Sequence, residues 1–214
     1  MNCKLCGKSE ISEINARAQR YYHCANCGLI FIDEKGVPGQ EKERKRYLEH
    51  NNTRASKGYV KMFEHFIDRL VAPYQNGMHS ALDFGCGPVT VLADLLEKRG
   101  LTVDVYDPYF FPRTFYKKNR YDLITATEVL EHLYDPHKEL DSLKNHLNEN
   151  GYLAVRTMFH PGPEKFSEWW YIRDPTHICF YNSKTFQWIA DHFSLKPVFG
   201  DGKKFCLLQK AQSR

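Results

Sequence analysis

The chain has 214 residues, which favours one domain or one domain with a small appendage and is ample to bury a core. Hydrophobic residues make up 42% and charged residues 26%, which excludes a disordered, collagen-like or coiled-coil chain. No apolar run approaches the roughly 18 residues of a membrane span, and no signal peptide is visible behind Met1. We therefore expect a cytoplasmic protein with no membrane partner.

The net charge of +4 is unevenly distributed. Residues 1–39 carry a net charge of +1 and residues 40–58 a net charge of +3, so the rest of the chain is neutral. Enzymes that act on nucleic acids usually spread positive charge over their working face. The distribution therefore disfavours a nucleic-acid partner without excluding it.

Two cysteine pairs open the chain, separated by seventeen residues: Cys3-x-x-Cys6 and Cys24-x-x-Cys27. Two such pairs in a reducing cytosol are typical of a four-thiolate zinc site, and the glycine after each pair lets the chain turn tightly around the sulfurs. A redox dithiol is the alternative, but it would be expected next to a βαβ unit. We predict that these four cysteines bind structural Zn²⁺, which stabilises a ribbon of residues 1–39 that is too small for its own core.

Residues 40–73 are predicted to form a helical connector or cap. Residues 40–56 are highly charged, and apolar side chains recur at helical spacing from Tyr59 to Leu70, before Pro73. The segment of residues 47–52 is either a solvated helix end or a flap over an active site.

Strands and helices alternate from residue 74 onward. The predicted strands are residues 81–84, 101–106, 121–126 and 152–158. The predicted helices are residues 89–99, a segment starting near residue 128, residues 140–147 closed by Asn150-Gly151, and residues 183–192. Residues 196–199 and 205–208 flank Gly200-Asp201-Gly202 and predict a hairpin. This order predicts an α/β sheet that is parallel except for one antiparallel edge strand.

Two of these strands end in residues suited to a ribose-bearing ligand. Asp83-x-Gly85-x-Gly87 follows the first strand and Asp107 ends the second, at the edge of an open sheet where ligands bind. Glycines allow the backbone to approach a ligand, and a carboxylate at the second station accepts hydrogen bonds from a ribose diol. Thr90 replaces the third glycine of the dinucleotide fingerprint, and no nucleoside-triphosphate loop is present. The alternatives are a tight turn at the glycines and an ordinary turn at Asp107.

Three runs of the sequence resemble the class I S-adenosylmethionine-dependent methyltransferases. They are Leu82-Asp83-Phe84-Gly85-Cys86-Gly87-Pro88, Tyr106-Asp107-Pro108, and Tyr121-Asp122-Leu123-Ile124-Thr125-Ala126-Thr127-Glu128-Val129-Leu130-Glu131-His132-Leu133. The resemblance covers roughly residues 56–214. His50-Asn51-Asn52 and Asp174-Pro175-Thr176-His177-Ile178 are more narrowly similar to small bacterial methyltransferases that carry an N-terminal zinc ribbon.

The resemblance implies a Rossmann-like methyltransferase domain over residues 74–214, with S-adenosylmethionine as cofactor. Asp83, Gly85 and Gly87 would line the methionine end of the cofactor, Asp107 would hold the ribose, and Thr127 and Glu128 would border the methyl-transfer site. The cofactor-binding residues are therefore predicted to be Asp83, Gly85, Cys86, Gly87, Asp107, Pro108 and Thr127.

One departure from the family concerns the adenine ring. Only residues 108–120 separate the second strand from the third, where the family usually places another strand with an acidic residue near the adenine amine. Tyr109 or Phe110 is therefore expected to border the base.

The predicted catalytic residues are Glu128 and His177, the latter as the candidate general base because its ordinary pKa suits proton removal near neutrality. A histidine that only holds its loop is the alternative for His177. His132 is expected to be structural or exposed. The aromatic group Trp169, Trp170, Tyr171, Phe180 and Tyr181 is either a satellite core or a substrate wall.

The sequence thus predicts an enzyme that transfers a methyl group to a small-molecule acceptor. One alternative is an RNA or protein methyltransferase that docks its target with the ribbon and the basic connector. The other alternative is a non-catalytic zinc-ribbon adaptor, which the intact Asp83, Gly85, Gly87 and Asp107 disfavour.

Overall fold

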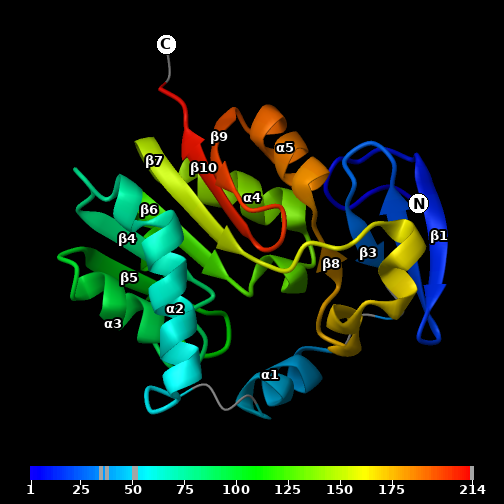
Figure 1. Ribbon diagram of the computed structural model, residues 1–214, viewed down its shortest axis with the longest axis horizontal. Helices are drawn as coiled ribbons and strands as arrows, with labels where there is room; N and C mark the ends of the chain where they lie inside the picture. The colour runs from blue at the N-terminus through cyan, green and yellow to red at the C-terminus, as the bar shows by residue number, and fades with distance from the viewer. Residues whose placement is uncertain (34–35, 37–38, 50–52, 213–214) are drawn as a thin grey trace.

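The computed structural model of the protein describes residues 1–33, 36, 39–49 and 53–212 (Figure 1). His50, Asn51 and Asn52, which belong to the predicted flap segment, lie outside the described residues. No helix in the described part of the chain is long and apolar enough to cross a membrane.

A six-stranded sheet forms the centre of the molecule, in the order β5-β4-β6-β7-β10-β9. Its strands are β4 (Ser80–Phe84), β5 (Thr102–Tyr106), β6 (Tyr121–Thr127), β7 (Leu147–Arg156), β9 (Leu195–Gly200) and β10 (Phe205–Lys210). The first four are parallel to one another, and the strand order reverses beside β4, which pairs with both β5 and β6. This reversal creates the point at which ligands bind in open α/β sheets.

The predicted α/β sheet is confirmed, with a difference at one edge. Strand β10 is the antiparallel strand, and it lies between β7 and β9, so β9 forms the edge and runs in the direction of the parallel strands. The Gly200-Asp201-Gly202 turn explains this arrangement, because Asp201 accepts hydrogen bonds from the amides of residues 203–205 and reverses the chain.

Five α-helices accompany the two sheets in the described residues. They are α1 (Gln40–Glu49), α2 (Lys57–Leu70), α3 (Val91–Glu97), α4 (Pro136–Asn145) and α5 (Ser183–His192). Shorter 3₁₀ turns are η2 (Ala72–Tyr74), η3 (Phe115–Lys118), η4 (Leu130–His132), η5 (Pro163–Glu168) and η6 (Trp170–Arg173).

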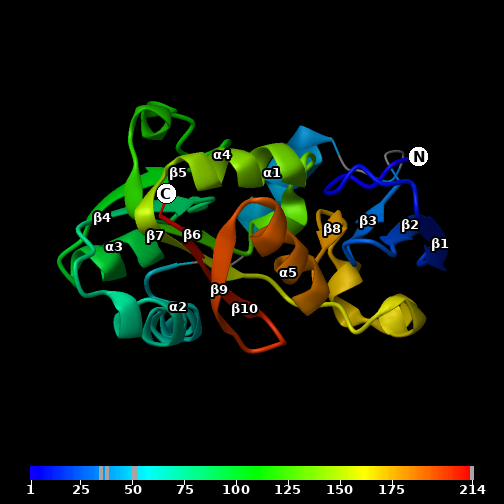
Figure 2. The same ribbon diagram turned by 90° about the horizontal axis from the view of Figure 1, so that it is seen from above.

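The central sheet is covered on both faces, because its strands carry apolar side chains on both faces. Ala81 and Leu123 pack with α2 and α3 on one face, whereas Leu82 and Ile124 pack with α4 and α5 on the other. Figure 2, seen from above, places α2 and α4 on opposite sides of the sheet. Helix α2 contributes Phe63, Phe66, Ile67 and Leu70, whose spacing of three and four residues makes one apolar stripe.

The chain between β6 and β7 differs from the predicted pattern. The segment after residue 128 is the short turn η4, and the helix that follows begins at Pro136, where Asp135 caps it by accepting a hydrogen bond from the Lys138 amide. The helix ends at Asn145, and Asn150-Gly151 lies within β7. Asn150 adopts φ +63°, so the chain bulges there while both flanks still pair with β6.

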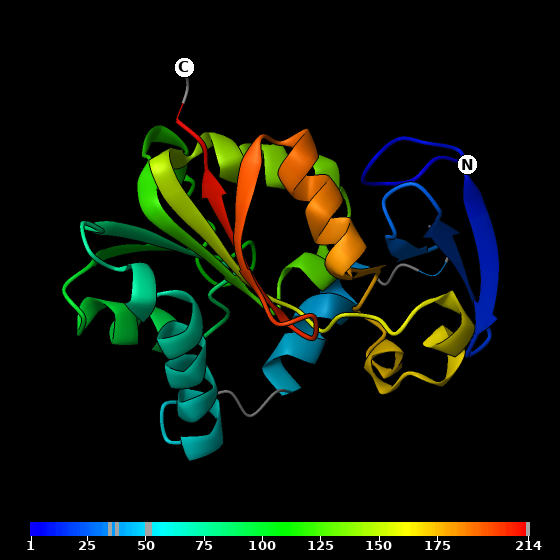
Figure 3. The same cartoon turned by 45° about the horizontal axis from the view of Figure 1, so that its top comes forward.

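A second sheet joins the N-terminal ribbon to a distant part of the chain. Strands β1 (Ile11–Ala16), β2 (Gln19–Cys24) and β3 (Ile30–Ile32) form a meander, and β8 (Cys179–Phe180) pairs with β3 as the fourth strand. Figure 3 shows the ribbon strands beside β8 and the 3₁₀ turns that precede it. The division into units of residues 1–39, 40–73 and 74–214 stays a prediction.

Candidate active site

The glycine loop after β4 lies at the point where the strand order reverses. Gly85 and Gly87 both have positive φ, +77° and +67°, which side-chain-bearing residues rarely adopt. A Cβ on Gly85 would approach Val129 Cγ2 to 2.3 Å, whereas a Cβ on Gly87 would meet no atom within 4 Å. Gly85 therefore lets the loop pack against residue 129, and Gly87 borders open space.

The predicted ribose residue, Asp107, is buried and bonded to the glycine loop. Its Oδ2 accepts a hydrogen bond from the Gly87 amide at 3.1 Å, and its Oδ1 accepts from the amides of Tyr109 and Phe110 at 2.8 and 3.1 Å. The carboxylate thus stabilises the turn after β5 and joins it to the loop after β4. Pro108 within that turn is exposed.

Asp83 is 1% exposed at the end of β4, where its Oδ1 accepts a hydrogen bond from Thr125 Oγ1 at 2.9 Å. Burial raises the pKa of Asp83 to about 7, an effect that the Thr125 hydroxyl opposes and the charge of Asp107 reinforces. The neighbouring Cys86 thiol is also buried, which raises its pKa. A positive group bound beside Asp83 would relieve this cost by pairing with the carboxylate.

The predicted catalytic residue Glu128 follows Thr127 at the end of β6. Glu128 adopts φ +56°, and its amide is fixed by the Arg156 carbonyl at 2.8 Å. Its side chain, one third exposed, forms an ion pair with Arg156 and accepts a hydrogen bond from the Tyr171 hydroxyl at 2.9 Å. Burial, followed by the charge of Glu131, raises the pKa of Glu128 to about 7, which suits a proton acceptor near neutrality.

A second carboxylate, Glu131, lies fully buried beside Glu128. The Tyr171 hydroxyl contacts both carboxyl groups, since it is also hydrogen-bonded to Glu131 Oε1. Burial raises the pKa of Glu131. The structure therefore brings two acidic side chains and a phenol together next to the glycine loop, because Val129 between them packs against Gly85.

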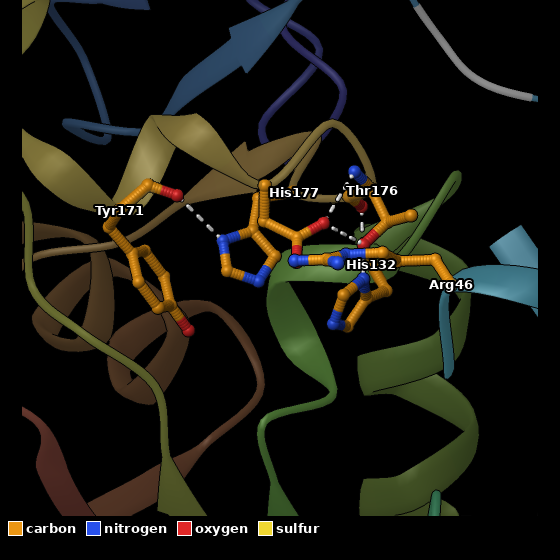
Figure 4. Close-up of polar contacts among 6 residues, drawn as sticks. Arg46, His132, Tyr171, Thr176 and His177 are labelled. Carbon is orange, nitrogen blue, oxygen red and sulfur yellow. Dashed lines mark hydrogen bonds and ion pairs between the residues drawn. The ribbon is translucent and has the colours of Figure 1, made fainter. Parts of the chain in front are cut away.

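The loop that precedes β8 brings His177 close to this acidic pair. Figure 4 shows the His177 ring between Tyr171 and His132. Its Nδ1 donates to the Tyr171 carbonyl at 2.8 Å, and its ring lies 4.1 Å from the Tyr171 ring and 4.9 Å from the His132 ring. Burial lowers the pKa of His177, so the imidazole is neutral near neutral pH and can accept a proton.

The loop that carries His177 is fastened at Asp174. The Asp174 carboxylate accepts hydrogen bonds from the Thr176 amide and hydroxyl at 3.0 and 2.6 Å, and it forms an ion pair with Arg46 of α1 at 3.1 Å. A second arginine of the connector, Arg54, pairs with Asp94 of α3 at 2.6 Å. The connector is thereby attached both to the His177 loop and to the helix that follows the glycine loop.

The four predicted zinc ligands form a separate cluster in the ribbon. The four sulfur atoms of Cys3, Cys6, Cys24 and Cys27 all lie within 4.8 Å of one another. The Sγ–Sγ distance is 3.6 Å for Cys3–Cys27 and 3.5 Å for Cys6–Cys24. These distances are too long for disulfides and close to the roughly 3.8 Å expected between sulfurs at the corners of a tetrahedral zinc site.

The two cysteine pairs lie in backbone turns of the same form. Gly7 and Gly28 both have positive φ, and their amides donate to the carbonyls of Cys3 and Cys24 at 3.0 and 2.8 Å. Burial raises the pKa of the Cys24 thiol to about 11, so a thiolate there needs a nearby cation. The donor set, its spacing and its burial fit a closed zinc site.

Two residues near the acidic pair, Arg156 and Tyr59, were not singled out from the sequence, and Tyr171 was named only within an aromatic group expected to be a satellite core or a substrate wall. Arg156 emerges from β7 beside Glu128, Tyr171 links the two carboxylates, and Tyr59 of α2 lies near Asp83 and Glu128, whose charges add to the effect of burial and raise its pKa to about 12. Glu131 and His132 belong to the run of residues 121–133 that resembles the methyltransferase family. A regular helix was expected there, but the structure contains the tight η4 turn, and this turn sets the direction of the two side chains.

The fold and the residues at the ends of β4, β5 and β6 are those of a Rossmann-like α/β protein of the class I methyltransferase type. A family model described as a methyltransferase domain matches residues 42–198, which is more than half of the chain. The chain therefore belongs to this family of enzymes. A comparison with curated protein sequences gives no match.

Several solved structures share the fold at low sequence identity. An O-methyltransferase family protein from Burkholderia thailandensis has a TM-score of 0.57 and 10% identity; the match covers 82% of this chain and 61% of that one. The mitomycin 7-O-methyltransferase MmcR has a TM-score of 0.56 and 13% identity, over 80% of this chain and 58% of that one. A 1,6-didemethyltoxoflavin-N1-methyltransferase from B. thailandensis, solved with that compound and S-adenosylhomocysteine, has a TM-score of 0.52 and 12% identity, over 95% of this chain and 100% of that one.

Proposed function

We propose that the protein binds S-adenosylmethionine in the loops after β4, β5 and β6 and transfers its methyl group to a small-molecule acceptor. The observation that carries this proposal is the joint position of Asp83, Gly87 and Asp107 at the reversal of strand order, with open space at Gly87. The family supports methyl transfer, and two fold neighbours are methyltransferases named for small acceptors, mitomycin and 1,6-didemethyltoxoflavin.

Each residue has a distinct role in this proposal. Gly85, Cys86 and Gly87 supply backbone close to the cofactor, and Asp83 provides the negative charge that attracts its ammonium and sulfonium end. Asp107 accepts hydrogen bonds from the ribose hydroxyls, with Pro108 at the turn. Thr127 borders the transferred methyl group. The sulfonium supplies an activated electrophile, so the protein's own task is to align the acceptor and take up its proton.

The proton acceptors are the side chains that meet below the His177 loop. Glu128 is partly exposed with a pKa near 7, and His177 is neutral with its Nδ1 committed to a backbone carbonyl. A base positioned in this way contributes about 10²–10⁴-fold to the rate. Neutral overall charge in residues 59–214 favours a small acceptor over RNA.

We also propose that Cys3, Cys6, Cys24 and Cys27 bind one structural Zn²⁺. Its role is to hold the ribbon in the form that pairs with β8, two residues beyond His177. The zinc would thus support the loop of the candidate base without contacting the acceptor.

Calorimetry with S-adenosylmethionine and S-adenosylhomocysteine tests the cofactor site. We expect both to bind the wild-type protein, and Asp107→Asn to weaken both by a similar factor of at least ten, because both carry the ribose. Asp141→Asn, an exposed position on α4 that bonds only Asn145 among the contacts described, is the matched control and should leave both affinities unchanged.

Thermal denaturation of the same variants separates cofactor binding from folding, because Asp107 also stabilises its own turn. Absence of binding by the folded wild-type protein would contradict the proposal and favour the non-catalytic adaptor. Tight binding of RNA at physiological salt would instead favour the nucleic-acid alternative.

A further inference from the structure

The described residues contain one cluster of metal-ligand side chains besides the four cysteines. It consists of Glu131, His132 and His177, which we call the histidine–carboxylate cluster. One ligand atom from each residue lies within 4.8 Å of the other two. Two of the residues come from the turn after β6 and the third from the loop before β8, so the fold itself brings them together.

Both imidazoles of the cluster are oriented by backbone carbonyls (Figure 4). His132 Nδ1 lies 2.9 Å from the Thr176 carbonyl, and His177 Nδ1 lies 2.8 Å from the Tyr171 carbonyl. A carbonyl oxygen can only accept a hydrogen bond, so both Nδ1 atoms carry hydrogen, and in the neutral form of either ring the lone pair is on Nε2. This is the tautomer and the supporting contact found around histidines that bind metals.

The carboxylate of the cluster lacks a partner for one of its oxygens. Glu131 is fully buried, and its Oε1 is hydrogen-bonded to the Tyr171 hydroxyl. The Thr157 hydroxyl lies beside the carboxyl group, but neither it nor Glu131 Oε2 has a partner at hydrogen-bond geometry among the residues that the structure describes. An orphaned oxygen on a buried carboxylate is energetically unfavourable, and a bound cation would supply the missing partner. Glu128 adds a second negative charge nearby, and Arg156 balances only that one.

We propose that Glu131, His132 and His177 bind a divalent transition-metal ion, with Zn²⁺ as the best match. Two nitrogen donors and one carboxylate form the donor set of catalytic zinc sites, whereas Mg²⁺ and Ca²⁺ prefer oxygen donors throughout. Three protein ligands leave a coordination position open. The site differs from the ribbon in donor chemistry, since the ribbon offers only sulfur.

The open position has a consequence for the substrate class, and this consequence rests on the proposed methyl transfer. The cluster lies beside Glu128 and is linked to the cofactor loop through Val129. An acceptor oxygen bound to the metal would lose its proton at lower pH, which favours hydroxyl compounds as acceptors. In the metal-bound protein His177 is a ligand, and Glu128 is the base that remains.

Metal content of the full-length protein tests the site. The protein is exposed to excess Zn²⁺, desalted, and analysed by mass spectrometry of the element. We expect the wild-type protein to hold one equivalent more than His177→Asn, His132→Asn or Glu131→Gln. Asparagine retains an N–H that can reach the backbone carbonyl, and glutamine retains an oxygen for Tyr171, so the fold is largely preserved.

The matched control is His137→Asn, which alters a half-buried histidine away from the cluster, whose Nε2 lies 3.2 Å from that of His192. It should retain the wild-type zinc content. Equal zinc content in wild type and all three cluster variants would overturn the proposal, as would loss of the equivalent in His137→Asn alone.

A titration of metal-free wild-type protein with Co²⁺ needs no variant. Co²⁺ in the ribbon produces thiolate charge-transfer absorption, and we expect a further equivalent to add ligand-field bands without changing that absorption. Saturation after the thiolate site alone would contradict the cluster.

The outcomes also separate this inference from the proposed function. A protein that binds S-adenosylmethionine but lacks the additional metal contradicts the inference alone. A protein that holds the additional metal but binds neither S-adenosylmethionine nor S-adenosylhomocysteine contradicts the proposed function alone.

Discussion

The buried carboxyl of Asp83 shows how one residue can couple cofactor binding to pH. Its pKa is raised to about 7 mainly by burial, so near neutrality the ligand-free protein holds Asp83 partly protonated. A raised carboxyl pKa stabilises the fold below the unfolded value near 4, and this contribution is lost as pH rises through 7. Binding of a cationic ligand is favoured at higher pH, because the ligand pairs with the ionised carboxylate of Asp83.

We therefore predict that the affinity for S-adenosylmethionine rises as pH increases from about 6 to 8, by up to about tenfold per pH unit below the pKa. Binding should release a proton, which calorimetry in buffers of different ionisation enthalpy measures directly. Asp83→Asn should bind more weakly and lose most of the pH dependence. An unchanged slope in that variant would assign the dependence to another group.

The second prediction at this scale concerns His177. His177→Ala should lower turnover at least tenfold while the affinity for S-adenosylmethionine changes little. The side chain contacts Tyr171 and His132, and the contacts among the described residues include none between it and the glycine loop. Single-turnover methyl transfer and calorimetry on the same preparation measure the two quantities. His137→Ala, at a half-buried histidine of α4, serves as the control. Full turnover by His177→Ala would remove His177 from the mechanism.

At the scale of elements, the turn after β4 is fitted to the turn after β6. Gly85 and Gly87 share a left-handed backbone, which costs a residue with a side chain about 1–2 kcal/mol. They differ in surroundings, since only a side chain at Gly85 would collide with Val129.

We expect Gly85→Ala to destabilise the protein by about 1–3 kcal/mol more than Gly87→Ala, because overpacking adds to the backbone cost. Chemical denaturation of both variants measures the difference. The double change Gly85→Ala with Val129→Ala should recover part of the loss relative to Val129→Ala alone. Equal destabilisation by the two single changes would show that backbone conformation is the whole effect.

Some elements could be predicted from the sequence more readily than others. The β4–loop–α3 and β5 segments were predictable because their signals are local: apolar runs, glycines and terminal acids within a few residues of one another. The helix expected after Glu128 was less predictable, because the apolar pattern of Leu130 and Leu133 fits a helix as well as the η4 turn that the structure contains. The fold class was confirmed, whereas the roles of the site residues stay predictions.

The grouping of the site residues could not be predicted from the sequence, because it depends on contacts between distant parts of the chain. Glu131 and His132 meet His177 only through the loop before β8, more than forty residues later, and Tyr171 joins the carboxylates from an irregular aromatic segment. A two-residue strand such as β8 has no recognisable pattern of its own, and its place depends on pairing with β3.

At the scale of the whole molecule, the ribbon and the methyltransferase part share one core. Cys24, Phe31 and Phe180 belong to the same buried cluster as Leu82 and Ile124. The His160 ring also contacts the Gly28 carbonyl at 2.9 Å, directly after the Cys24-x-x-Cys27 pair. Loss of a metal from the ribbon should therefore destabilise parts of the chain beyond residue 39.

We predict that Cys27→Ser lowers the zinc content by one equivalent, lowers the thermal midpoint, and increases hydrogen exchange in residues 178–180. Turnover should fall more than cofactor affinity, because the disturbed strand adjoins His177 and not the glycine loop. Cys206→Ser, a buried cysteine of β10, is the control and should retain the zinc. Normal exchange in residues 178–180 after zinc loss would contradict this coupling.

The pairing of β3 with β8 also has a consequence for biosynthesis. Ile30 and Phe180 are partners although 150 residues separate them along the chain. During translation the N-terminal sheet consequently lacks its fourth strand until most of the protein has been made, even if its cysteines have already captured metal. Such distant pairings slow folding, so this junction is a natural late step, and it offers a checkpoint at which an incompletely synthesised or nicked chain would fail to close.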